Sequence, residues 1–254
     1  MLNYVEYGKE NKYDDDIFFQ KYSQMSRSQQ GLAGAGEWET LRKLLPDFKD
    51  KRVLDLGCGY GWHCIYAMEH GASSVVGVDI SHKMLEVAKE KTHFPQVEYK
   101  CCAIEDVEFP EESFDVILSS LAFHYVADYE ILVKKIYRIL KSGGNLVFTV
   151  EHPVFTAYGT QDWYYNKKGE ILHFPVDNYY YEGKRTAVFL GEKVTKYHRT
   201  LTTYLNTLLS NGFIINHIVE PQPPEYMMDI PGMQDEMRRP MMLIVSANKN
   251  CYTT

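Results

Sequence analysis

The chain has 254 residues, of which 45% are hydrophobic and 24% charged, and its formal net charge is −7. These values suit one folded α/β domain and disfavour a nucleic-acid backbone as the main partner. The sequence has no apolar run of about 18 residues and no basic-then-apolar leader at its start, so we expect no membrane span and a cytoplasmic location. Five cysteines without a CxxC pair predict reduced thiols rather than disulfides or a metal site.

Polar residues and short helical patterns dominate the first fifth of the chain. In WETLRKLLPDF, residues 38–48, apolar side chains recur at helical spacing until Pro46 interrupts the pattern. We therefore expect residues 1–50 to form an N-terminal helical cap on a single domain that spans residues 1–254.

Apolar strands and helices alternate through the next hundred residues. The strands are apolar throughout, which is typical of a parallel sheet with both faces covered. The pattern predicts a doubly wound, Rossmann-like α/β sheet. Its strands are expected within 51–57, 73–81, 97–104, 113–126 and 145–153, and its helices within 60–71, 82–92 and 129–144.

The alternation stops after Pro153. Residues 154–199 are rich in aromatics and turn formers, and they predict a small antiparallel β insertion that covers the ligand edge of the sheet and the substrate. A helix at 201–212 and strands at 213–221 and 240–248 follow. We expect these strands to form an antiparallel last pair, which completes a seven-stranded sheet with its core in 51–153 and 200–249.

Three alternating glycines follow the first expected strand, in the stretch VLDLGCGYGWH at residues 53–63. They lie at the edge where ligands of open α/β sheets bind, and a ligand can approach bare peptide there. Asp79 ends the second strand, 20 residues after Gly59. A carboxylate at this place can accept hydrogen bonds from ribose hydroxyls, so the pattern predicts a ribose-containing ligand.

Two ligand classes carry a ribose and suit a glycine loop. A dinucleotide uses GxGxxG and places its pyrophosphate at the helix N-terminus, whereas this chain has GxGxG with Asp55 two residues before the first glycine. A buried carboxylate repels a pyrophosphate and attracts an ammonium or sulfonium group. The pattern therefore favours S-adenosylmethionine over a nicotinamide dinucleotide.

The successive motifs VLDLGCGYGWH, VVGVDIS, IEDVEFPEESFDVILSSLAFHYV and LKSGGNLVFTV resemble those of class I S-adenosylmethionine-dependent methyltransferases. The similarity covers residues 50–150 and is closest to the small-molecule branch that includes quinone-biosynthesis methyltransferases. It implies a Rossmann-like fold and S-adenosylmethionine as cofactor. It also implies methyl transfer to an O, N or C atom of a small-molecule acceptor, with S-adenosylhomocysteine as product.

The resemblance further implies roles for individual residues around the methionine part of the cofactor. Asp55 and the backbone of Gly57, Cys58 and Gly59 would hold this part, and Ser119 would lie near its tail. In related enzymes a segment before the first helix closes over the cofactor. In this chain that segment contains Tyr22, Met25 and Arg27. Arg27 would pair with the cofactor carboxylate, or it is simply a solvated surface charge.

For the nucleoside part, the resemblance implies that Asp79 holds the ribose and that Ile80 and Met84 pack on the adenine. The edge of the adenine would be formed by Ala103, Ile104 and Glu105. The family often has an aspartate where Ala103 stands. Glu105, Asp106 or a backbone oxygen would then have to accept from the adenine amino group.

A general base is needed only if the acceptor loses a proton. The candidates are His124 after the fourth strand, His152 just past the fifth, and His198 at the end of the insertion. Each has a purely structural alternative, and His198 with Arg199 can also face an anionic acceptor. The aromatic insertion suits a flat or apolar acceptor or a cation, or it forms its own small core or the face of a homodimer.

Two other functions remain open from the sequence. The first is an NAD-dependent oxidoreductase, against which the missing third glycine of GxGxxG and Asp55 speak. The second is a non-catalytic S-adenosylmethionine-binding protein. Nucleic-acid methylation is disfavoured because SSLAF follows the fourth strand in place of an Asp/Asn-Pro-Pro-aromatic motif. We therefore expect a small-molecule acceptor, no nucleic acid and no membrane as partners.

Overall fold

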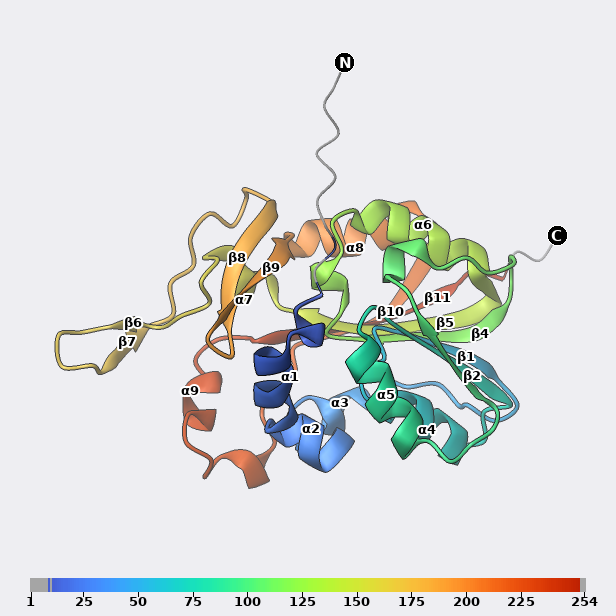
Figure 1. Ribbon diagram of the computed structural model, residues 1–254. Coiled ribbons are helices and arrows are strands. Elements are labelled where there is room, and N and C mark those ends of the chain that lie inside the picture. Colours follow the sequence, from blue (N-terminus) through green and yellow to red (C-terminus); the bar gives the residue numbers. More distant parts are fainter. Residues whose placement is uncertain (1–8, 10, 252–254) are drawn as a thin grey trace, which may run out of the picture.

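A seven-stranded mixed sheet forms the centre of the protein in a computed structural model that describes residues 9 and 11–251 (Figure 1). Its strands lie in the order β10-β11-β5-β4-β1-β2-β3. Strand β11 is antiparallel to both of its neighbours, and the other neighbouring pairs are parallel. The predicted Rossmann-like sheet with an antiparallel last pair is confirmed. The strands are β1 (Arg52–Leu56), β2 (Ser74–Asp79), β3 (Val97–Cys101), β4 (Phe114–Ser120), β5 (Leu140–Glu151), β10 (Phe213–Val219) and β11 (Met242–Lys249).

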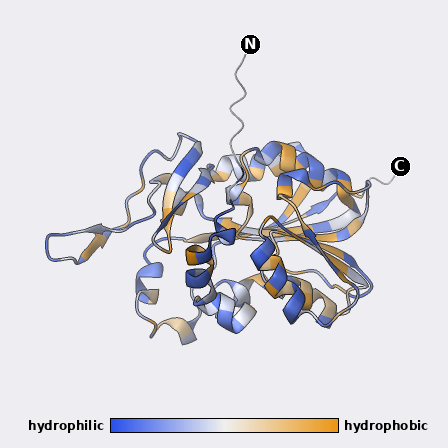
Figure 2. Ribbon diagram, in the orientation of Figure 1, coloured by the Kyte–Doolittle hydropathy of each residue, from blue (hydrophilic) through white to orange (hydrophobic). Residues whose placement is uncertain are grey.

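Helices cover both faces of the sheet (Figure 1). On one face, α6 (Tyr129–Ile139) and α8 (Leu201–Ser210) pack on the strands through a large apolar cluster. On the other face lie α4 (Trp62–Glu69) and α5 (His82–Lys91) with a second cluster. Hydrophobic residues on these helices recur on the faces turned to the sheet (Figure 2). The two buried faces explain why the strands are apolar throughout.

The N-terminal segment is a series of short helical turns rather than long helices. These are η1 (Lys12–Asp14), α1 (Asp16–Ser23), α2 (Ser26–Gln30), η2 (Gly31–Gly34) and α3 (Trp38–Leu41). The helical pattern at 38–48 gives only the four residues of α3, and residues 42–44 continue as a turn before Pro46. Residues 1–8 and 10 of the predicted cap lie outside the described residues.

The helix predicted within 129–144 is shorter than expected. Helix α6 ends at Ile139, and Leu140 already has an extended backbone with φ −79° and ψ 135°. Leu140 is fully buried and pairs with Phe114 of β4, so it begins strand β5. The two glycines that predicted the end of the helix lie inside this strand. A Cβ at Gly144 would stand only 2.8 Å from Leu140 Cδ1 and 2.9 Å from a backbone oxygen, which explains the glycine.

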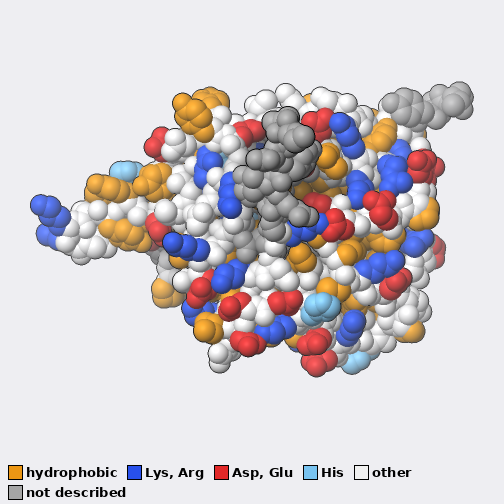
Figure 3. Space-filling model, turned by 45° about the horizontal axis from the view of Figure 1, so that its top comes forward, with side chains coloured by type: hydrophobic (Ala, Val, Ile, Leu, Met, Phe, Trp, Pro, Cys, Tyr) orange, Lys and Arg blue, Asp and Glu red, His pale blue; other side chains and the backbone are white. Residues whose placement is uncertain are grey.

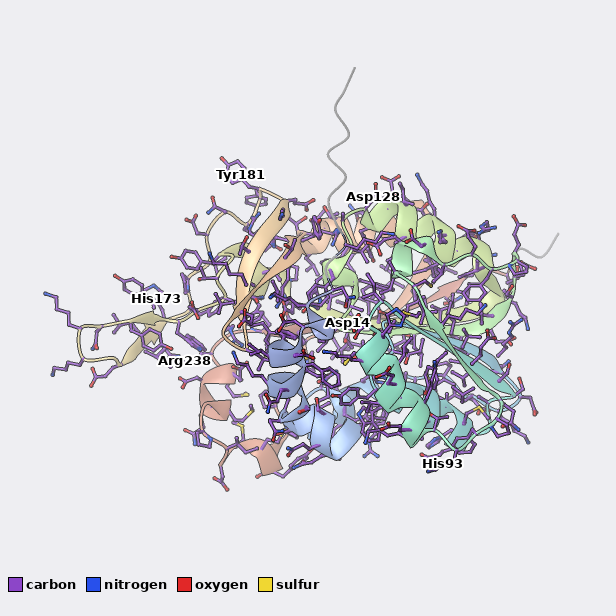
Figure 4. All side chains as sticks on the ribbon, viewed as in Figure 1. Asp14, His93, Asp128, His173, Tyr181 and Arg238 are labelled. Atoms are coloured by element: carbon purple, nitrogen blue, oxygen red, sulfur yellow. The ribbon has the colours of Figure 1, made fainter. Side chains whose placement is uncertain are left out.

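The chain between β5 and α8 forms two small antiparallel sheets where the composition predicted one small antiparallel insertion. Helix α7 (Pro153–Ala157) is followed by the pair β6 (Tyr164–Tyr165) and β7 (Ile171–His173), and then by the pair β8 (Gly183–Phe189) and β9 (Glu192–His198). The β6–β7 hairpin stands out from the body, with apolar side chains along it (Figures 1 and 3). Arg238 lies near its base and donates to the carbonyl of Leu172 at 2.7 Å (Figure 4).

A long segment connects the last two strands. Residues 220–241 contain the short turns η5 (Glu225–Met227) and α9 (Met233–Glu236). In Figure 1 this segment runs below the β8–β9 pair and beside α1 and α2. It thus returns to the edge at which the parallel strands end. No helix among the described residues has the length and hydropathy needed to cross a membrane.

Candidate active site

The glycine loop after β1 is shaped by close backbone packing. Gly57 has φ +79°, and a Cβ there would lie 2.4 Å from the Cβ of Ala122. The amides of Gly57 and Cys58 both donate to the carbonyl of Val78, at 2.8 and 2.9 Å. Because β1 and β2 are neighbours, this bond pair holds the loop against the end of β2. Both the positive φ at position 57 and the closeness of Ala122 therefore require glycine there.

Asp79 fixes the other side of the loop. Its Oδ2 accepts the amide of Gly59 at 2.9 Å, and its Oδ1 accepts the amide of Ser81 at 2.9 Å. Burial raises the pKa of this carboxyl group. The carboxylate therefore lies between the loop and the start of α5, and it faces a large cavity.

That cavity has a volume of about 630 Å³ and lies at the carboxyl ends of β1, β2, β4 and β5. Its size is within the range of pockets that hold small molecules and cofactors. It brings together most of the residues expected to hold the cofactor. Those that line it are Tyr22, Arg27, Gly57, Gly59, Asp79, Ile80, Met84, Ala103, Ile104 and Glu105.

Asp55 and Cys58 lie beneath the loop rather than on the cavity wall. Asp55 is 1% exposed, and Cys64 Sγ lies 3.5 Å from its Oδ2. Its Oδ1 is buried without a hydrogen-bond partner, and burial raises the pKa of the group to about 7. A carboxyl group this poorly solvated is sensitive to any cation placed near the loop.

Ser119 also points away from the cavity. It is 2% exposed, and its hydroxyl donates to the carbonyl of Leu56 at 2.7 Å. Successive side chains on a strand alternate between its faces, and the next residue, Ser120, lines the cavity. Serine at both positions left the sequence without a signal to choose between them.

The N-terminal segment covers the cavity and is fastened beside the glycine loop. Asp14 Oδ1 accepts the hydroxyl of Ser81 at 2.6 Å and the amide of Lys83 at 3.1 Å, and Oδ2 accepts the amide of His82 at 3.3 Å. Asp14 therefore supplies partners for the exposed amides at the start of α5. Figure 4 shows it between α1 and α5.

Arg27 is not a free surface charge. Its guanidinium forms an ion pair with the buried Glu37, and it also donates to Ser120 Oγ at 3.3 Å. Glu37 keeps one carboxylate oxygen buried without a hydrogen-bond partner. Arg27 and Tyr22 therefore both reach the cavity from the N-terminal segment, and Arg27 does so with a carboxylate already beside it.

Of the three candidate histidines, the structure places His124 on the cavity wall. His152 instead caps α7, with its Nδ1 accepting the amide of Val154 at 3.1 Å, and its Nε2 lies 2.9 Å from Glu220. His198 is fully buried between the hydroxyl of Thr156, 2.7 Å away, and the carbonyl of Tyr179, 2.8 Å away.

Arg199, considered with His198 for an anionic acceptor, is also directed elsewhere. Its guanidinium donates to the backbone carbonyls of Phe123, Val126 and Ala127. These carbonyls belong to the short turn η4 (Phe123–Tyr125) and the two residues after it. Arg199 therefore supports the turn that carries His124 and does not line the cavity.

Sequence reasoning missed a large part of the cavity wall. The segment between β10 and β11, together with the first residue of β11, supplies Pro221, Gln222, Pro223, Tyr226, Met227, Ile230, Met233, Glu236, Met241 and Met242. The sequence predicts strands at 213–221 and 240–248 but no binding role for the residues between them. Glu151 at the end of β5 was missed as well. The one available signal was its position at the carboxyl end of a parallel strand, where ligand-binding residues gather.

The buried titrating groups predict how stability depends on pH in the ligand-free protein. Burial lowers the pKa of His63 and His124 to about 4, so each stabilises the fold above about pH 6.5 and loses this contribution as pH falls. The pKa of Asp55 is raised to about 7, so this group acts in the opposite direction and offsets the effect of one histidine. Between pH 6 and 5 these groups should lower the free energy of unfolding by about 1.4 kcal/mol per pH unit.

Asp55→Asn removes the offsetting group, so this slope should increase to roughly 2.8 kcal/mol per pH unit. Urea unfolding of both proteins at pH 6 and pH 5 measures the difference. Other titrating groups contribute equally to both proteins and cancel. Equal slopes would show that Asp55 is already ionised at pH 5.

Comparison with known proteins places the chain in a family. Residues 54–148 match a family model described as a methyltransferase domain. A solved S-adenosylmethionine-dependent methyltransferase from Mesorhizobium loti is 40% identical, with a TM-score of 0.80 over 86% of this chain and 100% of that one. A structure from Listeria monocytogenes, provisionally assigned to the same class, is 58% identical, with a TM-score of 0.83 over 87% of this chain and 99% of that one.

A partial match covers the central region. The ubiquinone biosynthesis O-methyltransferase of Coxiella burnetii is 35% identical over 112 residues, which are 43% of this chain and 47% of that protein. The fold and the glycine loop are those of a class I transferase with a Rossmann-like sheet. The chain belongs to the S-adenosylmethionine-dependent methyltransferases, and its cofactor is S-adenosylmethionine. The class predicted from the sequence is confirmed, and the oxidoreductase alternative is not favoured.

Proposed function

We propose that the cavity holds S-adenosylmethionine at the ends of β1 and β2 and a small-molecule acceptor toward the ends of β4 and β5. The observation that carries this assignment concerns the loop at 57–61. Its glycine backbone and the Asp79 carboxylate line the same cavity. In this arrangement Asp79 accepts hydrogen bonds from the ribose hydroxyls. Ile80, Met84 and residues 103–105 surround the adenine.

The residues present fit this cofactor. A Cβ at Gly59 would come within 3.3 Å of Met84 Cε, so the absent side chain keeps the space between the loop and α5 open. The unpartnered Oδ1 of Asp55 lies below the same loop and favours a cation above it. Arg27 lines the same cavity and has donors for a carboxylate. A cation site and an anion site, which a zwitterionic amino-acid tail requires, are therefore both present.

When bound, S-adenosylmethionine supplies an electrophilic methyl group on a sulfonium. The protein's own residues then orient the acceptor and exclude water, which can account for roughly 7–11 kcal/mol of the barrier in a well-oriented reaction. The N-terminal segment and residues 220–242 close over the cavity and serve this purpose. Phe189 of the insertion also lines the cavity, which supports a covering role for the β8–β9 pair.

His124 is the candidate histidine that can touch the acceptor. Its Nδ1 accepts the amide of Glu151 at 3.4 Å, so the neutral ring carries its proton on Nε2. With its pKa lowered to about 4 by burial, the ring is neutral at pH 7. We therefore assign His124 as a hydrogen-bond donor that positions the acceptor rather than as a base.

His124→Ala should lower kcat/KM by about tenfold, the cost of one hydrogen bond, and should leave S-adenosylmethionine affinity unchanged. His124→Gln keeps an N–H donor and should retain more activity than the alanine variant. His152→Ala is the matched control, since His152 lies off the cavity, and it should leave kcat/KM near the wild-type value. Equal losses in the alanine and glutamine variants would contradict a donor role.

The proposed function is tested in two steps. Isothermal titration calorimetry should show one site for both S-adenosylmethionine and S-adenosylhomocysteine. Methyl-labelled cofactor incubated with fractionated small metabolites should then give S-adenosylhomocysteine and a labelled small molecule. Absence of cofactor binding would refute the site. Binding with no transfer to any fraction would instead favour a protein that binds the cofactor without catalysing transfer.

A further inference from the structure

The acceptor part of the cavity is lined mainly by apolar and adaptable side chains. Six of the ten methionines in the sequence line the cavity, and four of them come from residues 227–242. Phe189 and Ile230 add further apolar surface. Methionine side chains adapt to ligands of irregular shape and attract aromatic rings. This lining suits a ligand with a large apolar body.

The charged groups on this wall are already paired within the protein. Arg27 and Glu37 belong to the part of the cavity assigned to the cofactor tail. Among the described residues that line the rest of this wall, the carboxylates are Glu151 and Glu236, and each has its own cation, Lys196 and Arg239 respectively. Lys9, at the adenine side, is likewise paired with Asp106.

In the Glu151–Lys196 pair, Glu151 lines the cavity and Lys196 lies behind it. The Lys196 side chain is 3% exposed and that of Glu151 is 12% exposed. Gln161 contacts both partners, donating to Glu151 Oε2 at 2.6 Å and accepting from Lys196 Nζ at 2.9 Å. The ammonium also lies 5.4 Å from the centre of the Phe189 ring. Neither charge of this pair is available to a ligand without breaking these contacts.

The Glu236–Arg239 pair is fixed in a different way. Arg239 donates to both carboxylate oxygens of Glu236, at 2.6 and 3.1 Å. The Arg239 guanidinium also lies 4.5, 4.9 and 5.0 Å from the centres of three aromatic rings, which belong to Phe155, Phe174 and Trp163. Cation–π contacts of this kind hold the guanidinium in place independently of the carboxylate.

We propose, on the basis of the proposed function, that the methyl acceptor is an uncharged molecule with a large apolar body. An anionic or cationic acceptor would lose its hydration in this part of the cavity without meeting an unpaired counter-charge, or would have to break an internal ion pair. Either event is unfavourable for a buried charge. An uncharged apolar acceptor avoids both costs, and the methionine-rich segment can close around it.

Three probes on one naphthalene scaffold test the charge preference. They are 2-naphthol, 6-hydroxy-2-naphthoate and 6-(aminomethyl)-2-naphthol, titrated by naphthol fluorescence into protein saturated with S-adenosylhomocysteine. 2-Naphthol should bind at least about tenfold more tightly than either charged probe, which corresponds to 1.4 kcal/mol or more. Equal or tighter binding of a charged probe, or no binding of 2-naphthol, would overturn the inference.

A variant gives a second, independent reading. Glu236→Gln leaves Arg239 on its aromatic rings without its carboxylate, so 6-hydroxy-2-naphthoate should gain about tenfold in affinity while 2-naphthol changes little. Glu130→Gln is the matched control, since Glu130 forms an exposed ion pair with Lys134 on α6. An unchanged carboxylate affinity in Glu236→Gln would contradict the inference.

Two outcomes distinguish a failure of the proposed function from a failure of the inference about the acceptor. If S-adenosylhomocysteine does not bind, the proposed function itself is wrong. If it binds and the charged probes are not disfavoured, the cofactor site stands and the inference about the acceptor is wrong.

Discussion

Replacing Gly57 with alanine is expected to lower the free energy of unfolding by about 2–5 kcal/mol and to abolish S-adenosylmethionine binding. Two costs add at this position. An alanine must adopt φ +79°, which is unfavourable for any residue with a Cβ, and that Cβ would lie 2.4 Å from the Cβ of Ala122. Relief of the contact requires the loop or the turn after β4 to move. Both line the cavity.

Gly169→Ala provides the control for conformation alone. Gly169 lies in the β6–β7 turn with φ +80°, and nothing lies within 4 Å of the position of its Cβ. In this variant the free energy of unfolding should fall by only about 1–2 kcal/mol, and the cofactor affinity should be unchanged. Urea unfolding and calorimetry on both variants measure the effects. If Gly57→Ala behaved like Gly169→Ala, close packing would not be the reason for glycine at position 57.

Replacing Asp79 with alanine should weaken S-adenosylmethionine binding by about 1–3 kcal/mol, the cost of losing a charged hydrogen-bond acceptor. The carboxylate accepts the amides of Gly59 and Ser81 in the free protein. Its removal therefore loosens the loop in addition to removing the proposed ribose contact. Asp79→Asn keeps one acceptor oxygen and should lie between the alanine variant and the wild type.

Asp115→Ala separates this effect from a general loss of stability. Asp115 lies near the amino end of β4, away from the cavity, where it accepts the amide of Arg52 and pairs with Lys141. Its removal should destabilise the fold without changing cofactor affinity. Calorimetry on the folded variants decides the matter. Unchanged affinity in Asp79→Ala would remove the ribose assignment.

The order of strands and helices could be predicted because each was determined by local sequence. Apolar runs bounded by glycines alternate with amphipathic helices. This alternation indicates a parallel sheet even when the individual apolar residues differ. The boundary between α6 and β5 could not be predicted in this way. It depends on Leu140 being buried beside Phe114, a contact across the sheet that no local pattern records.

The cofactor side of the cavity was also accessible from sequence, because its residues follow strand ends in short motifs. Side-chain direction within those motifs was less accessible. Ser119 and Ser120 differ only in the face of β4 on which they lie. Asp55 carries the expected charge, but it lies under the loop where burial raises its pKa to about 7.

The acceptor side escaped prediction because distant segments form it. Glu151 and Lys196 are 45 residues apart in sequence, and Lys196 stands in the middle of a small β hairpin. The methionines of residues 227–242 follow no helical or strand period that would identify a binding wall. Their shared surface exists only after β11 inserts between β5 and β10 and brings this segment back to the cavity.

The contact between Asp14 and α5 has a consequence for ligand exchange. The segment that Asp14 fastens covers the cavity, and the amides it satisfies belong to the helix that begins three residues after Asp79. A ligand that leaves past this segment must wait until those hydrogen bonds open. The opening of these hydrogen bonds then contributes to the residence time of the product, although Asp14 itself does not line the cavity.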